Sequence, residues 1–312
     1  MNKPNTTPGA PGAPGASATP GAPDSPVISD TPDPATPGSP GSPIAPIKLV
    51  AIDLDGTLLR SNKRLSSANA KAVADVTRLG VHIILASARP PRGVRDIYQH
   101  LGINTLQVNY NGALIHDMPR NKNVYHQPMP ATLAKKIVKF ARKKDPAVVV
   151  SVEILDKWYT DHVDDKLPTE TSKHFSPDFI GPLDAFLTIP VTKLMLLAPP
   201  DKLKPIHEAV RARFAKDIAI LISDDYLIQI VDKHVDKSTA LQRVAEHYNI
   251  PQPQVMAIGD APNDLGMVQW AGLGVAMENA WDLLKRNADT TAPNNDDDGV
   301  AHVLKKYILD KQ

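Results

Sequence analysis

Two aspartates two positions apart, Asp53 and Asp55, stand at the end of the apolar run 47–54. Residues two apart in an extended segment point to the same side, so both carboxylates can face one ligand. Two close carboxylates suit a divalent cation, or a nucleophile beside a group that donates and accepts a proton. A β-hairpin turn is the alternative interpretation, because Asp55-Gly56 is a strong turn signal.

A second polar group, Asp260, Asn263 and Asp264, follows the apolar segment 255–258. If both apolar segments are strands of one parallel sheet, their ends meet at the edge where such sheets bind ligands. The alternative is that these residues cap the helix expected at 264–270, since Asn and Asp are common at helix N-termini.

Ser87 ends the apolar segment 83–86, and Lys237 begins a segment with helical spacing. A hydroxyl and backbone N–H groups at a helix start can hold a phosphate, whose charge a lysine can offset. Each residue also has an ordinary explanation, as a serine at a strand end and as a solvated lysine. Together, the four sites supply a carboxylate nucleophile, a proton donor, a hydroxyl, a lysine and metal-binding carboxylates. Phosphoryl transfer through an aspartyl-phosphate with Mg²⁺ requires this set.

The elements that position these residues alternate between buried strands and amphipathic helices. This alternation predicts an α/β fold with a Rossmann-like parallel sheet covered by helices. Short apolar runs predict the strands, and apolar residues at helical spacing predict the helices. The expected strands are 47–54, 81–86, 106–115, 255–258 and 273–276, and the expected helices are 66–79, 94–101, 238–248, 264–270 and 281–287.

The middle of the chain has a different pattern, in which strands follow strands. The expected strands are 148–155, 157–161, 192–197 and two within 218–231, and the expected helices are 133–144 and 203–214. Strands in succession indicate an α+β module rather than a continuation of the parallel sheet. We therefore expect a cap domain at 127–228, inserted into a catalytic core made of 47–126 and 229–312.

Composition narrows the remaining possibilities. Residues 1–46 are rich in Pro, Gly and Ala and poor in large apolar residues, which predicts a disordered tail. The 312 residues include 35 Lys and Arg, 34 Asp and Glu and no cysteine, which excludes disulfides and a cysteine nucleophile. The near-neutral charge gives no reason to expect nucleic-acid binding, and no apolar run has the length of a membrane span. We expect a cytoplasmic protein.

From residue 47 to near the C-terminus, the chain resembles the haloacid dehalogenase-like (HAD) hydrolases, most closely the Cof-type sugar-phosphatase branch with a type IIB cap. The segments that carry the resemblance are Asp53-Leu54-Asp55-Gly56-Thr57-Leu58, Ser87, Lys237 and Gly259-Asp260-Ala261-Pro262-Asn263-Asp264, similar to the four family motifs, and Asn111-Gly112-Ala113 and Asp298-Gly299-Val300, similar to features of the branch. The chain departs from the branch at Ala88 and Ser238, where glycine is usual, and this bears on the geometry around the phosphate.

The resemblance implies how the acidic residues act. Asp53 would attack phosphorus, while Asp55 would protonate the leaving alcohol and then deprotonate the hydrolytic water. Mg²⁺ would be held by Asp53, the backbone carbonyl of Asp55 and Asp260. Asp264 would bind it directly or through a water.

The resemblance also implies which residues surround the phosphate. Ser87 and Lys237 would hold the phosphoryl oxygens and offset their charge. Leu54 and Ala88 would lie beside the phosphate, and Asn263 would position Lys237 or the phosphate itself.

The expected function is Mg²⁺-dependent hydrolysis of a small phosphomonoester, first of all a sugar phosphate. Asn111 in the core and Trp158 and Tyr159 in the cap are candidates for selecting the leaving group, although both aromatic residues could instead pack the cap on the core. One alternative is a phosphomutase acting on hexose phosphates. Another is a non-catalytic regulator that binds a phosphosugar, which would not need Asp55. The expected partner is a small phosphorylated metabolite, and the sequence predicts no oligomeric state.

Overall fold

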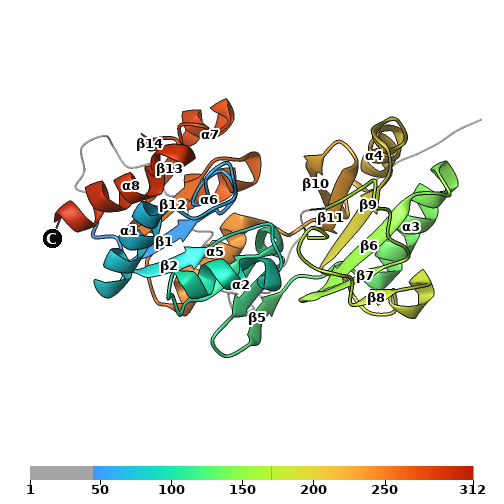
Figure 1. Ribbon diagram of the computed structural model, residues 1–312, viewed down its shortest axis with the longest axis horizontal. Helices are drawn as coiled ribbons and strands as arrows, with labels where there is room; N and C mark the ends of the chain where they lie inside the picture. Colours follow the sequence, from blue (N-terminus) through green and yellow to red (C-terminus); the bar gives the residue numbers. More distant parts are fainter. Residues whose placement is uncertain (1–44, 170, 312) are drawn as a thin grey trace, which may run out of the picture. The chain divides into compact units, whose positions relative to one another are not determined.

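The core sheet has five parallel strands in the order β14-β13-β12-β1-β2 (Figure 1). The computed structural model describes residues 45–169 and 171–311, so nearly all of the predicted tail at 1–46 lies outside the described residues. The strands are β1 (Leu49–Ile52), β2 (His82–Leu85), β12 (Val255–Gly259), β13 (Leu273–Met277) and β14 (Thr290–Ala292). Their aliphatic side chains belong to one buried cluster, as expected where helices cover a parallel sheet.

Helices follow the core strands in the predicted alternation. They are α1 (Ser67–Arg78), α2 (Pro91–His100), α5 (Lys237–His247), α6 (Leu265–Trp270), α7 (Asp282–Asn287) and α8 (Gly299–Tyr307). Side chains cap two of them at the N-terminus: Ser66 Oγ accepts from the N–H of Asn69 at 3.0 Å, and Asp236 Oδ1 accepts from the N–H of Thr239 at 2.9 Å. The second cap fixes Lys237 in the first turn of α5.

The prediction of one strand at 106–115 was wrong. The segment contains β3 (Leu106–Asn109), the 3-10 turn η1 (Tyr110–Gly112) and β4 (Leu114–Asp117), which with β5 (Lys122–His126) form an antiparallel sheet. The chain reverses because the three residues of η1 have φ angles of 52°, 57° and 103°. Non-glycine residues rarely adopt positive φ, so the apolar character of 106–115 concealed the turn.

The inserted part has its own six-stranded mixed sheet, in the order β10-β11-β9-β6-β7-β8. The strands are β6 (Val149–Ile154), β7 (Lys157–Thr160), β8 (Phe179–Ile180), β9 (Lys193–Leu197), β10 (Ile218–Asp224) and β11 (Leu227–Asp232). Two helices, α3 (Ala131–Lys144) and α4 (Pro200–Phe214), pack on one face and share a buried cluster with it (Figure 1). The fold class is therefore the predicted one: a parallel α/β core with an inserted α+β module.

The chain enters and leaves the insert at neighbouring points. Gln127, just before α3, donates through Nε2 to Oδ1 of Asp232 at the end of β11, at 3.1 Å. Strand β11 runs across the expected boundary between residues 228 and 229 and pairs with β9 and β10. The division into core and cap at 127–228 remains a prediction, and the pairing of β11 leads us to propose the return crossing after Asp232.

Short 3-10 helices connect several elements: η2 (Leu183–Ala185), η3 (Gln252–Gln254), η4 (Pro262–Asp264) and η5 (Asn295–Asp297). A further one, η6 (Leu309–Lys311), follows α8. Across the described parts of the chain, no helix combines the length and apolar character needed to cross a membrane.

Candidate active site

Asp53 and Asp260 lie near each other because the strands that precede them are neighbours. β1 pairs with β12 in parallel, with Ile52 opposite Ile258. The N–H of Asp53 continues this ladder by donating to the carbonyl of Ile258 at 3.0 Å. The two polar strand ends therefore meet at one edge of the sheet, as the strand pattern predicts.

The ammonium of Lys237 lies between two carboxylates. Its Nζ donates to Oδ1 of Asp53 and to Oδ1 of Asp264, each at 2.6 Å, and the side chain is 0% exposed. Burial acts to lower the pKa of Lys237, but the charges of Asp264 and Asp53 outweigh it and hold this pKa above its ordinary value. Burial also raises the pKa of Asp53 well above its ordinary value, against the attraction of Lys237.

Three carboxylates, from Asp53, Asp260 and Asp264, offer oxygens that all lie within 4.8 Å of one another. The hydroxyl of Thr57 orients Asp260 by donating to Oδ1 at 2.7 Å. Gly56 allows this approach: its φ is +91°, and a Cβ on it would lie 2.4 Å from Oδ2 of Asp260. Burial, with the charge of Asp264 adding to it, raises the pKa of Asp260 to about 6.

The donor set of this acidic triad fits a hard divalent cation. Carboxylate oxygens are the ligands that Mg²⁺ and similar ions prefer, and Lys237 offsets only one of the three carboxylate charges. The side chain of Asp55 is not a member of the triad, and it faces two other cations.

The carboxylate of Asp55 forms a two-pronged ion pair with Arg89, with Nε–Oδ2 at 2.7 Å and Nη2–Oδ1 at 2.6 Å. Lys63 donates to the same Oδ1 at 2.9 Å. Partial burial acts to raise the pKa of Asp55, but the hydrogen bonds and charges of Arg89 and Lys63 hold it below its ordinary value. Sequence reasoning missed both cations. The available signal for Arg89 was its position two residues after Ser87.

Loops from three parts of the core bring the expected phosphate-binding residues together. Ser87 Oγ accepts from the N–H of Arg89 at 3.1 Å, which shapes the turn after β2. The carbonyl of Ser87 accepts from the N–H of Asn111 at 3.0 Å, and Asn111 Oδ1 accepts from Nδ2 of Asn263 at 2.8 Å. The contact between Asn263 and Asn111 was not predicted. The remaining expected residues, Leu54 and Ala88, are buried and half-buried in the loops after β1 and β2.

Trp158 and Tyr159 point to opposite faces of the insert sheet, because they are neighbours on β7. Tyr159 belongs with the helix-covered face, and its ring stacks on Phe186 with the ring centroids 5.7 Å apart. Trp158 belongs to the other face, where Nε1 donates to Oγ of Ser151 at 3.3 Å. Only Trp158 of this pair lines the pocket described next.

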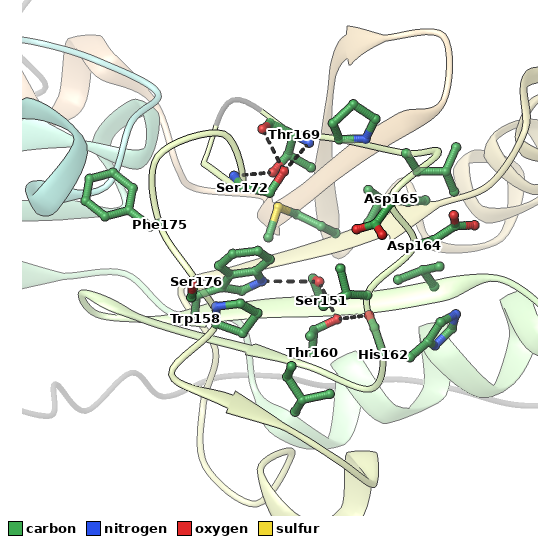
Figure 2. A pocket seen from close by; sticks show the side chains of 18 of the residues that line it. Ser151, Trp158, Thr160, His162, Asp164, Asp165, Thr169, Ser172, Phe175 and Ser176 are labelled. Atoms are coloured by element: carbon green, nitrogen blue, oxygen red, sulfur yellow. Dashed lines mark hydrogen bonds between the residues drawn. The ribbon is translucent and has the colours of Figure 1, made fainter.

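A pocket of about 440 Å³ lies over the face of the insert sheet that α3 and α4 do not cover (Figure 2). Ser151, Trp158 and Thr160 form a hydrogen-bonded part of its wall, with Ser151 Oγ donating to Thr160 Oγ1 at 2.8 Å. Met195 and Leu197 add apolar surface from β9. The volume and the mixed lining are typical of a small-molecule site.

The rim of this pocket approaches the core at Phe175. The ring centroid of Phe175 lies 5.7 Å from the guanidinium carbon of Arg92, which belongs to α2. Arg92 stands three positions after Arg89, the partner of Asp55. The rim of the pocket therefore contacts the core at α2, which begins two residues after Arg89.

Comparisons with known proteins agree with this fold. A family model described as haloacid dehalogenase-like hydrolase matches residues 50–304. The 5-amino-6-(5-phospho-D-ribitylamino)uracil phosphatase YitU of Bacillus subtilis is 29% identical over 269 residues, covering 83% of this chain and 97% of that protein. A solved haloacid dehalogenase-like hydrolase from Bacteroides thetaiotaomicron is 28% identical, with a TM-score of 0.77 over 83% of this chain and 99% of that one. A solved HAD subclass IIB sugar phosphatase, 20% identical, shares the fold with a TM-score of 0.67 over 83% of this chain and 98% of that one.

The chain belongs to the haloacid dehalogenase-like hydrolases. Its mixed-sheet insert after β5 has the fold of the Cof-type, subclass IIB branch. It is a phosphatase of this superfamily that acts on small phosphomonoesters, and the acidic triad stands at the edge of its core sheet.

Proposed function

We propose that this phosphatase hydrolyses its substrate through an aspartyl-phosphate on Asp53, with Mg²⁺ as the metal. The observation that carries the proposal is the place of the Asp53 carboxylate, which accepts a hydrogen bond from Lys237 and lies close to the carboxylates of Asp260 and Asp264. Lys237 orients Asp53 and supplies positive charge where the phosphoryl oxygens would lie.

Asp53, Asp260 and Asp264 would hold the ion, together with the backbone carbonyl of Asp55. When bound, Mg²⁺ would offset the repulsion between an anionic nucleophile and an anionic phosphate.

Two displacements at phosphorus complete the reaction. An oxygen of Asp53 bonds to phosphorus as the bond to the alcohol breaks, and Asp55 gives its proton to that alcohol. A water then attacks the phosphorus of the aspartyl-phosphate, Asp55 takes the proton of this water, and inorganic phosphate and free Asp53 result. Ser87 and Lys237 would bind the phosphoryl oxygens in both steps.

We propose that the leaving alcohol extends past Arg89 into the pocket lined by Trp158. The approach of Phe175 to Arg92 supports this path, because Arg92 stands three positions after Arg89, the partner of Asp55. A sugar phosphate remains the first candidate substrate. The apolar surface of Trp158 and Met195 favours a second candidate, a phosphorylated alcohol that carries an aromatic ring. The substrate in the name of the Bacillus subtilis relative has such a ring.

We expect the protein to release phosphate from p-nitrophenyl phosphate in the presence of Mg²⁺. Excess EDTA should abolish turnover and added Mg²⁺ should restore it, because the carboxylates alone repel the phosphate. A panel with glucose 6-phosphate, pyridoxal 5′-phosphate and flavin mononucleotide would compare the two substrate candidates. Isomerised hexose phosphate without phosphate release would indicate a phosphomutase. Failure to hydrolyse any of these compounds with Mg²⁺ would count against a phosphatase and favour a binding role.

Removing Arg89 is expected to move the pH profile of kcat/KM. Arg89→Met deletes the cation that holds the pKa of Asp55 down, so this pKa rises. Asp55 must carry a proton to act on the leaving alcohol, so the alkaline limb of the profile should shift to higher pH. At the optimum, kcat/KM should fall about tenfold, because Asp55 loses the partner that orients it.

Lys63→Met is the matched control, because Lys63 makes one bond to Asp55 and is more exposed than Arg89. In Lys63→Met, the alkaline limb of the kcat/KM profile should also move to higher pH, but by less than in Arg89→Met. An unchanged alkaline limb in Arg89→Met would contradict the assignment of Asp55 as the proton donor.

A further inference from the structure

The segment Tyr110-Asn111-Gly112 is held in a conformation that few residues adopt. All three residues have positive φ, and Tyr110 and Asn111 are not glycines. Two consecutive non-glycine residues in this region persist only where the surroundings fix them firmly. Each residue of the segment contacts a different part of the molecule.

Gly112 packs on the start of α5, the helix that carries Lys237. A Cβ on Gly112 would lie 2.3 Å from the carbonyl oxygen of Asp236 and 3.2 Å from the nitrogen of Lys237. No side chain fits there, so the segment and the helix start rest directly against each other. A shift of this segment would therefore also move Lys237.

Asn111 and the backbone of Tyr110 bind the other loops of the phosphate site. The N–H of Tyr110 donates to the carbonyl of Arg89 at 3.3 Å, and the N–H of Asn111 donates to that of Ser87 at 3.0 Å. The Asn111 side chain accepts from Asn263. The segment thus contacts the loops of Ser87 and Asn263 and the helix start that carries Lys237.

The side chain of Tyr110 leaves the core and reaches the insert. Tyr110 is 1% exposed, and its hydroxyl lies 2.7 Å from Oε2 of Glu153 and 2.6 Å from the carbonyl oxygen of Leu155. An ionised carboxylate and a carbonyl can only accept, so the single phenolic proton serves both. Lys193 Nζ lies 5.1 Å from the centre of the ring.

Glu153 ties this contact into a buried group of charges drawn from core and insert. Its side chain is 0% exposed and pairs with Arg92 of α2 at 2.7 Å and with Lys193 of β9 at 3.1 Å. A buried carboxylate is stable only while its partners remain in place. Glu153 therefore fixes where the Tyr110 hydroxyl must lie relative to the insert.

We propose that Tyr110 is a positioning residue that couples the placement of the insert to the geometry of the phosphate site. When the insert holds the Tyr110 hydroxyl through Glu153, it also holds the segment that supports Lys237, Ser87 and Asn263. This inference rests on the proposed function, which identifies the site as a phosphate site. The new part is how the insert affects the geometry of that site.

Tyr110→Phe tests the coupling, because it keeps the buried ring and removes only the hydroxyl. With p-nitrophenyl phosphate, kcat should fall about tenfold and KM should change little, since the groups that bind phosphate remain but are held less firmly. Glu153→Gln should lower kcat in the same way. The double variant Tyr110→Phe/Glu153→Gln should lower kcat by about as much as either single variant, because both changes break the same contact. The matched control is Tyr98→Phe, because Tyr98 is a buried tyrosine whose hydroxyl donates within the core, to the carbonyl of Thr105 at 2.9 Å.

A distance measurement tests the coupling independently of activity. The sequence has no cysteine, so Leu79→Cys in the core and Ile189→Cys in the insert give two defined sites for spin labels, and both positions are exposed. Tyr110→Phe should broaden the distribution of distances between the labels, and Tyr98→Phe should leave it unchanged. In the parent, orthovanadate with Mg²⁺ should narrow the distribution, and in Tyr110→Phe it should narrow it less.

The two measurements separate this inference from the proposed function. If Tyr110→Phe keeps both the kcat and the label distances of the parent, or alters them only as much as Tyr98→Phe does, the coupling is wrong even though the phosphatase assignment stands. If no phosphate ester is hydrolysed but the distances respond to Tyr110→Phe, the coupling stands and the proposed reaction is wrong.

Discussion

Asp53→Asn is expected to reduce turnover of p-nitrophenyl phosphate by at least about a thousandfold, because an amide oxygen cannot form the aspartyl-phosphate. The fold should persist, since the asparagine oxygen can still accept from Lys237, which bonds Asp53 at 2.6 Å. Steady-state kinetics with saturating Mg²⁺ measures the loss, and the far-ultraviolet circular dichroism spectrum checks the fold.

Asp75→Asn is the control for the general effect of this exchange. Asp75 lies on α1 and pairs with Lys71 and Arg78 on the surface of that helix. Its activity should stay within about a factor of two of the parent, as is usual for surface changes. Full activity in Asp53→Asn would refute Asp53 as the nucleophile.

Lys237→Met is expected to destabilise the protein by about 3–5 kcal/mol and to abolish turnover. The lysine is fully buried between Asp53 and Asp264, and removing one partner of a buried ion pair leaves charge that nothing compensates. Methionine keeps most of the length of the side chain, so the effect reports the lost charge rather than a cavity. Urea titration measures the loss of unfolding free energy, provided that the dependence of this free energy on urea concentration has the same slope in both proteins.

Lys71→Met makes the same exchange on the surface, where Lys71 pairs with Asp75 and is 76% exposed. The change in the free energy of unfolding should be within about 1 kcal/mol, because exposed pairs contribute little. Equal effects of the two lysine variants would contradict the view that Lys237 balances the buried carboxylates.

The core sheet and most of its helices could be predicted, because local patterns specify them. Continuous apolar runs such as 255–258 fit strands buried on both faces, and helical spacing identified α1 and α5. The hairpin inside 106–115 could not be predicted in this way. Its turn depends on the positive φ of Tyr110 and Asn111, which contacts from distant parts of the chain hold in place.

The acidic residues of the site could be predicted to converge, because each follows a strand of the same parallel sheet. Asp53, Asp260 and Asp264 are adjacent in the structure for this reason. Lys237 reaches them from the start of α5, which follows a strand of the insert sheet. The partners of Asp55 were missed, since nothing local to Lys63 or Arg89 shows that their side chains turn back to a carboxylate. The sequence suggested the same role for Trp158 and Tyr159. The structure shows that the two side chains lie on opposite faces of the insert sheet.

The most direct test of the central claim is to locate the phosphorylated residue. The protein would be mixed with p-nitrophenyl phosphate and Mg²⁺, quenched in acid and treated with borohydride, which reduces an aspartyl-phosphate to homoserine. Peptide mass spectrometry should then find homoserine at position 53, and only when both substrate and Mg²⁺ were present. Homoserine in place of an aspartate other than Asp53 would contradict the account. Full turnover by a protein in which no homoserine is found at position 53 would also contradict it.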